Sequence, residues 1–283
     1  MLLKKAIPAV AMIAAGLIAG CGGGGTAPAT GTTAVSGKVA DGYLFGATVF
    51  LDKNGNYQLD AGEPSTTTDA NGNYTLNVDP ADVGKYPIVA LVIKGQTIDK
   101  DTGMSVTGSY VLSMPATATS GTVGSNFISP MSSELREMME TGKYASMQQA
   151  MNALVAKLGM TAGTNMLEDY MLANNATIHT AAQNIASLMG GEMAQVMGTS
   201  GATITVNVNR YRSMMGTIFS NMSSIKGSNS MAAMTTLMGT MTTTLGSMPM
   251  TSAGQPYQNM SSAFKGGMMG GTAGTSMGSG MMN

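Results

Sequence analysis

A twelve-residue acidic stretch carries the side chains in this sequence that are best suited to chemistry. Oxygen-bearing side chains occupy its positions 1, 3, 5, 9 and 12, and a backbone carbonyl falls at position 7. The residues concerned are Asp52, Asn54, Asn56, Asp60 and Glu63, with Gln58 supplying the carbonyl. This is the spacing of calcium loops, whose oxygens converge on one ion and whose last glutamate binds through both oxygens. The stretch therefore predicts a Ca²⁺ site, because Mg²⁺ demands a smaller and more regular ligand set.

One position of this stretch departs from the calcium-loop pattern. Such loops carry glycine at position 6, where the chain bends sharply, and here that residue is Tyr57. A tyrosine resists the positive φ that glycine tolerates, so we expect a wider turn or weak binding. Affinity on the order of 10⁻⁴ to 10⁻³ M would be enough for a structural ion. The alternative is that residues 52–63 are only a polar surface turn.

A second polar group, Asp69, Asn71 and Asn73, repeats the same alternation without a closing glutamate. Its Asn-Gly pair at 71–72 predicts a hairpin turn, because both central residues of such a turn take positive φ.

The other reactive residue types do not form a catalytic set. The single histidine, His179, lies on a predicted helix, and Asp99 and Asp101 are interpreted as a solvated turn pair. Residues 274–278 match the Gly-x-Ser-x-Gly pattern, but they lie in a glycine-rich tail without the strand and helix that this motif needs. The sequence has no phosphate-binding loop and no paired zinc motif. We therefore predict that the protein is not an enzyme.

Methionine is abundant, with 30 residues that lie mostly in the C-terminal two thirds of the chain. At helix-face positions such as Met147, Met151, Met214 and Met238 we expect it to fill the core. The tail differs, because its methionines lie among Gly, Ser and Thr: Met260, Met268, Met269, Met277, Met281 and Met282. Thioether sulfur suits Cu(I) or Ag(I), so these six are candidate soft-metal ligands. The alternative is a disordered low-complexity tail.

The N-terminus has the pattern of an export signal. Lys4 and Lys5 precede an apolar run at 6–18 and small residues before the only cysteine, Cys21. Leu17-Ile18-Ala19-Gly20-Cys21 resembles the lipobox of bacterial lipoproteins, which implies cleavage after residue 20 and acylation of Cys21. Gly22, where enteric inner-membrane lipoproteins carry Asp, favours the outer membrane. The alternative is a plain signal peptide with a chance cysteine.

Composition limits the class of partner. Charged residues make up 10 %, glycine is abundant at 38, and losing Lys4 and Lys5 with the signal moves the formal charge from −1 to −3. Neither nucleic acid nor an anionic lipid surface is indicated as a partner. Residues 21–33, rich in Gly, Thr, Ala and Pro, are interpreted as a flexible tether.

Residues 34–124 are predicted to form a small antiparallel β-sandwich, from short alternating runs and a continuous apolar run at 88–93. Residues 35–39, 46–52 and 68–76 resemble the carboxypeptidase-regulatory or B-type repeat modules of bacterial surface proteins. That resemblance implies a prealbumin-like sandwich with a calcium loop between its second and third strands.

Residues 126–246 are predicted to form a Met-rich helical domain, and 247–283 a disordered tail. Six helical segments are expected, near 130–142, 147–158, 165–168, 178–189, 211–222 and 231–245. Ser129-Pro130 marks the first start, and Ser146 with Gln149 marks the second, which Gly159 ends. Residues 127–170 resemble the helical half of bacterial lipoproteins in which a regulatory-like β module comes first. The fold class is thus α+β by domains.

The leading prediction is a non-enzymatic cell-envelope lipoprotein with a calcium-stabilised β module, which serves surface binding, adhesion or scaffolding. Its partners would be the membrane, through the lipid on Cys21, and an unknown protein or surface. The alternative is an envelope protein that binds or sequesters Cu(I) or Ag(I) through its Met-rich C-terminal half.

Overall fold

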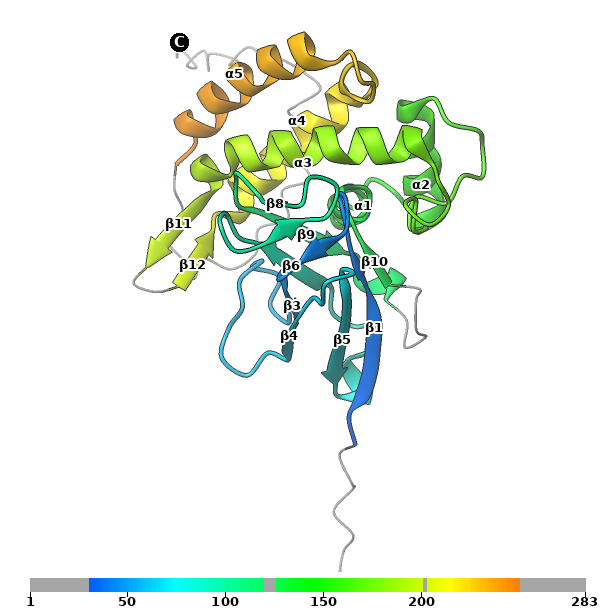
Figure 1. Ribbon diagram of the computed structural model, residues 1–283, viewed down its shortest axis with the longest axis vertical. Coiled ribbons are helices and arrows are strands. Elements are labelled where there is room, and N and C mark those ends of the chain that lie inside the picture. Colours follow the sequence, from blue (N-terminus) through cyan, green and yellow to red (C-terminus); the bar gives the residue numbers. More distant parts are fainter. Residues whose placement is uncertain (1–30, 120–125, 201–202, 250–283) are drawn as a thin grey trace, which may run out of the picture. The chain divides into compact units, whose positions relative to one another are not determined.

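The computed structural model describes residues 31–119, 126–200 and 203–249 (Figure 1). Cys21, the predicted signal peptide at 1–20, most of the tether, the six tail methionines and the 274–278 motif lie outside the described residues.

Strands β1 to β10 precede the α-helices, and a two-stranded hairpin of β11 and β12 lies between α3 and α4; the predicted α+β arrangement is confirmed. The strands are β1 Thr33–Val39, β2 Leu44–Phe45, β3 Thr48–Leu51, β4 Ser65–Thr67, β5 Asn73–Val78, β6 Ile88–Val92, β7 Ile98–Asp99, β8 Met104–Ser105, β9 Tyr110–Met114, β10 Asn126–Ile128, β11 Met197–Ser200 and β12 Thr203–Val206. The α-helices are α1 Pro130–Glu140, α2 Met147–Leu158, α3 Ala176–Val196, α4 Val208–Ile225 and α5 Met231–Ser247, with 3₁₀ turns η1 Pro80–Asp82 and η2 Ala116–Ala118.

The larger sheet is antiparallel, in the order β4-β3-β6-β9. All five residues of β6 are buried, which confirms the prediction that this apolar run is covered on both faces. A second sheet has the order β10-β1-β5, and β2, β7 and β8 form a third small one. The strand pairs within 34–124 are antiparallel, as predicted, whereas β10, which lies beyond those residues, runs parallel to β1.

The turn after β4 is not the predicted hairpin. β4 pairs with β3 and β5 pairs with β1, so the turn at 69–72 connects strands of two different sheets. Gly72 has φ of 73°, whereas Asn71 is not among the described residues with positive φ. Asp69 Oδ1 accepts hydrogen bonds from the backbone N–H groups of Asn71 and Asn73 and fixes the turn from within.

The helix-start signals work as predicted. Ser129 caps α1 in a box with Ser132, and Ser146 caps α2, whose end is followed by Gly159 in the left-handed conformation. The segment at 165–168 forms turns rather than a helix. Helix α3 continues through Gly190 without interruption.

Helices and strands share one hydrophobic core. Helix α1 packs on β9, and α3, α4 and α5 pack on one another beside the strands (Figure 1). β10 belongs to the segment that we predicted to be helical, 126–246, yet it pairs with β1 of the N-terminal β region. Among the described residues, no helix combines the length and apolarity that crossing a membrane requires.

A substitution at Gly37 tests the joint between β1 and β10. A methyl group there would lie 2.7 Å from the carbonyl carbon of Asn126, so we expect Gly37→Ala to lower the free energy of unfolding by about 1–3 kcal/mol in urea. Gly239→Ala is the control, because no atom lies within 4 Å of the added methyl group in α5, and alanine should raise helix stability by up to about 1 kcal/mol. Equal effects of the two substitutions would contradict the close approach.

Candidate metal loop and its buried charge network

The predicted calcium loop connects β3 to β4, the two strands of an antiparallel pair. Its last residue folds back across its first: Glu63 Oε1 accepts a hydrogen bond from Lys53 N at 2.7 Å, and Oε2 accepts one from Asp60 N at 3.0 Å. Asp60 Oδ2 accepts from the side-chain amides of Asn54 and Asn56, at 2.8 and 2.7 Å. The structure therefore brings four of the predicted ligands into one closed loop.

Asp52, the first predicted ligand, points away from solvent into the core. It is fully buried, and its Oδ1 accepts from the backbone N–H groups of Gly55 and Asn56. Its Oδ2 accepts from Tyr57 N at 3.2 Å and forms an ion pair with Arg136 Nη2 at 3.0 Å. With two donors on each oxygen, this carboxylate is already satisfied by protein groups.

Tyr57 takes the positive φ that we expected a tyrosine to resist, with a value of 61°. Contacts of its side chain explain why the expectation of a wider turn was wrong. The ring is fully buried, the guanidinium of Arg136 lies 3.9 Å from its centre, and the ring of Tyr211 lies 4.6 Å away. Its hydroxyl donates a hydrogen bond to Glu137. Such packing offsets the strain of the left-handed backbone, which amounts to about 1–3 kcal/mol.

These contacts belong to a network of buried charges between the loop, α1 and α4. Arg136 Nε lies 2.9 Å from Glu140 Oε1, and Arg212 Nε lies 3.2 Å from Glu137 Oε2. Arg212 also pairs with Glu140. Burial, followed by the neighbouring Glu140, raises the pKa of Glu137 to about 7, although both arginines act to lower it. Buried charges of this kind are tolerated because each has an opposite charge and hydrogen bonds.

Glu134 is the exception on α1. It is fully buried, and neither carboxylate oxygen has a hydrogen-bond partner within the described residues. Burial, and then the charge of Glu137, raises the pKa of Glu134 well above its usual range. An uncharged carboxylic acid is the form that such surroundings favour at neutral pH.

The fit of the loop to a cation is therefore uneven. Asn54, Asn56, Asp60 and Glu63 are exposed or half-buried oxygen carriers, while Asp52 is bound to Arg136. In the part of the chain that the structure describes, no three side chains of His, Cys, Asp or Glu are placed together as a metal site. A cation would rest on the outer donors and the Gln58 carbonyl, and would replace the amide hydrogen bonds to Asp60.

Sequence reasoning missed Arg136, Glu137 and Arg212 as partners of the loop. The available signal was in α1, where acidic and basic residues are dense in a chain that is only 10 % charged. Nine of its eleven residues are buried, so these charges face protein rather than water.

The other candidates fall in different places. His179 Nε2 lies 2.6 Å from Asp101 Oδ2, and its ring stacks on Tyr170, so Asp101 is tied to α3 instead of being a purely solvated turn residue. Met214 is fully buried, and Met147, Met151 and Met238 pack against the core, as the core-filling interpretation expects. The soft-metal alternative depends on tail residues outside the described ranges.

Removing the partner of Asp52 tests the network. We expect Arg136→Met to lower the free energy of unfolding by about 3–5 kcal/mol, because a buried carboxylate loses its counter-ion. Urea unfolding followed by circular dichroism measures this change. Lys53→Gln is the matched control at the start of the same loop: its partner is Asp82 and its side chain is 37 % exposed, so the free energy of unfolding should barely change. Similar losses for both variants would contradict the network.

Comparisons of this chain with models of known protein families, with curated proteins and with solved structures give no match.

Proposed function

We propose that this chain is a non-enzymatic cell-envelope lipoprotein whose folded part serves surface binding, adhesion or scaffolding, with loop 52–63 as a structural calcium site. The lipobox-like residues that end in Cys21 support the envelope location. Three acyl chains on that residue would hold the protein on a membrane far more firmly than one. The partners of the folded part would be a protein or a surface, and not nucleic acid.

The observation that carries this proposal is the way the loop is fastened. Residues of the loop contact α1 through the Asp52–Arg136 ion pair and α4 through the rings of Tyr57 and Tyr211. These contacts connect the β3–β4 loop to both helices. The inward-facing side chains, Asp52 and Tyr57, are therefore structural residues. The loop's outward oxygens, on Asp60 and Glu63, are the part that a calcium ion would stabilise further.

The calcium ion would add to the network rather than create it. Asn54, Asn56, Asp60, Glu63 and the Gln58 carbonyl would hold the ion, which would neutralise the two outer carboxylates. Asp52 would contribute weakly, because Arg136 already neutralises it. Binding should therefore be weak, on the order of 10⁻⁴ to 10⁻³ M.

Calcium dependence of thermal unfolding tests the site. For the full chain, a calcium concentration about ten times the dissociation constant should stabilise the fold by about 1.4 kcal/mol relative to EDTA. Asp60→Asn combined with Glu63→Gln should abolish this difference. Asp69→Asn, at an exposed acidic turn outside the loop, should leave it intact. If calcium does not shift the unfolding of the unsubstituted chain, the calcium part of the proposal is wrong.

Lipid attachment tests the envelope part independently. Since Cys21 is the only cysteine, a labelled fatty acid carried by a thioether-linked diacylglycerol can be assigned to it. We expect Cys21→Ser to lose the label and to move from the membrane to the soluble fraction after cell breakage. Retention of the variant in the membrane fraction would show that another feature holds the protein there.

A further inference from the structure

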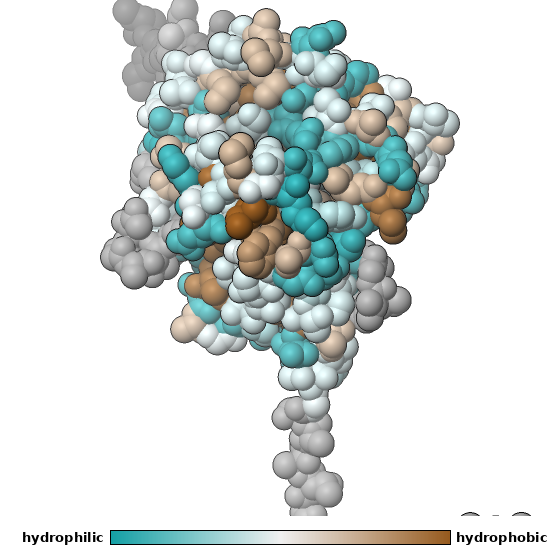
Figure 2. All heavy atoms as spheres, viewed as in Figure 1, coloured by the Kyte–Doolittle hydropathy of each residue, from teal (hydrophilic) through white to brown (hydrophobic). Residues whose placement is uncertain are grey.

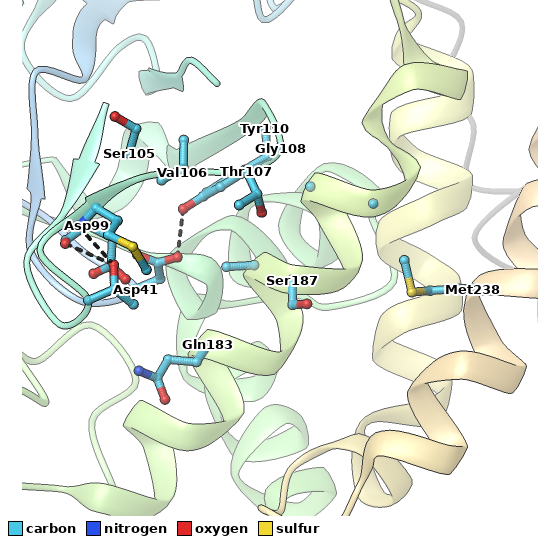
Figure 3. A pocket seen from close by; sticks show the side chains of 15 residues that line it. Asp41, Asp99, Ser105, Val106, Thr107, Gly108, Tyr110, Gln183, Ser187 and Met238 are labelled. Atoms are coloured by element: carbon cyan, nitrogen blue, oxygen red, sulfur yellow. Dashed lines mark hydrogen bonds between the residues drawn. The ribbon is translucent and has the colours of Figure 1, made fainter. Parts of the chain in front are cut away.

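A pocket of about 520 Å³ lies between the segment that includes β7 and β8 and helix α3 (Figure 3). Side chains from distant parts of the sequence line it, among them Asp41, Asp99, Met104, Val106, Tyr110 and Met238. Figure 2 shows apolar residues near the centre of the face on which β8 and α3 lie in Figure 1, with polar residues around them. The volume is that of a site for a small molecule.

The two walls of the pocket are held together at glycines. A methyl group on Gly108 would lie 2.8 Å from the carbonyl carbon of Gly190, so the loop before β9 rests on the backbone of α3. Only residues without a side chain permit this approach. The pocket is therefore shaped by backbone contact and does not need a ligand to form.

Asp41 carries a carboxylate oxygen that the protein leaves unused. It lies in the short turn between Ala40 and Tyr43, which form an isolated bridge. Its Oδ2 accepts a hydrogen bond of 2.6 Å from the hydroxyl of Tyr110 (Figure 3). Its Oδ1 is buried and has no hydrogen-bond partner among the described residues. A buried acceptor without a donor is costly, and an ionised one more so.

The charged groups that face Asp41 are acidic or already engaged. Asp99 and Asp101 lie beside the turn, and a methyl group on Gly42 would meet both of their side chains. His179 is engaged by Asp101, and the hydroxyl of Tyr170 donates to the backbone oxygen of Asp41. Burial, with Asp99 and Asp101 adding to it, raises the pKa of Asp41 to about 7. Among the described residues that line the pocket, no lysine or arginine is present to neutralise Asp41.

The rest of the lining is mixed: Thr102, Ser105, Thr107, Gln183 and Ser187 are polar, and Met104, Val106, Ala186 and Met238 are apolar. Met104 is 66 % exposed, one of the few large apolar side chains of the described chain that lie open to water, and Val106 and Met238 line the same pocket. A ligand that covered these side chains would gain from apolar burial, about 25 cal/mol for each Å².

We propose that this pocket binds a small organic cation, with Asp41 as the counter-ion of its ammonium group and Met104, Val106 and Met238 against its apolar part. An ammonium group supplies the positive charge that Asp41 and the neighbouring carboxylates of Asp99 and Asp101 favour. The inference rests on the pocket alone, and it depends neither on the calcium loop nor on the lipid anchor.

Titration of the full chain with phenethylammonium at pH 8 tests this inference, with 2-phenylethanol as the uncharged ligand of matching shape. We expect a dissociation constant for the amine on the order of 1 mM, and at least about tenfold weaker binding of the alcohol. Lowering the pH from 8 to 6 should weaken amine binding about tenfold, because the pKa of Asp41 near 7 means that most of its carboxylate becomes protonated. The comparison of two ligands on the unsubstituted chain needs no variant that might misfold.

Asp41→Asn should weaken amine binding about tenfold and remove its pH dependence, since the amide keeps the shape of the side chain but carries no charge. Asp69→Asn removes an exposed carboxylate outside the pocket and should change neither property. Hexylammonium serves as a second amine without a ring. The proposal is overturned if the chain binds amine and alcohol equally well, or if Asp41→Asn leaves the affinity for the amine unchanged. It is also overturned if neither amine binds at concentrations up to about 20 mM.

Discussion

The buried ion pair between Asp52 and Arg136 is the constraint on which the arrangement of strands and helices depends. An isolated charge in this position would cost several kcal/mol, so neither residue tolerates the loss of the other. The pair holds the end of β3 against α1. The Tyr57 hydroxyl adds a hydrogen bond to Glu137 of α1, and the Tyr57 ring extends the contact to Tyr211 of α4. The ion pairs of Arg136 and Arg212 thus join the loop, α1 and α4 in one network.

This constraint also explains the unusual character of α1. The helix is buried on almost every side, yet it carries an arginine and three glutamates. Arg136, Glu137 and Glu140 are used to bind the loop and α4, while Glu134 is buried without a partner and so favours its uncharged form. These charged groups connect three elements, whereas Asp41 Oδ1 in the described chain is buried without a hydrogen-bond partner.

Features that depend on neighbouring residues could be predicted from the sequence. The caps at Ser129 and Ser146, the end of α2 at Gly159 and the buried strand β6 all follow from local signals, and the α+β order follows from the change of apolar period along the chain. The spacing of oxygens in loop 52–63 predicted a calcium site, which stays a prediction; the structure shows Glu63 folded back to Lys53.

Features that depend on distant residues could not be predicted. No local signal says that Asp52 will meet Arg136, 84 positions later, instead of facing a cation. The positive φ of Tyr57 has the same origin, because propensity argues against it and only the surrounding rings and guanidinium stabilise it. The Asn-Gly turn at 71–72 was mistaken for a hairpin because turn chemistry does not reveal which strands pair. The pocket is lined by four separate segments, at 41, 99–110, 183–191 and 238, so no single stretch of sequence could have predicted it.

The parallel pairing of β10 with β1 has a consequence for the order in which this chain can fold. β1 ends at Val39, but its partner on one edge does not begin until Asn126. Until that later segment is in place, the edge lacks hydrogen-bond partners, and an open edge can recruit a strand from another chain. Correct maturation thus depends on residues that follow the last strand of the larger sheet, and a fragment that stops before them would be prone to self-association.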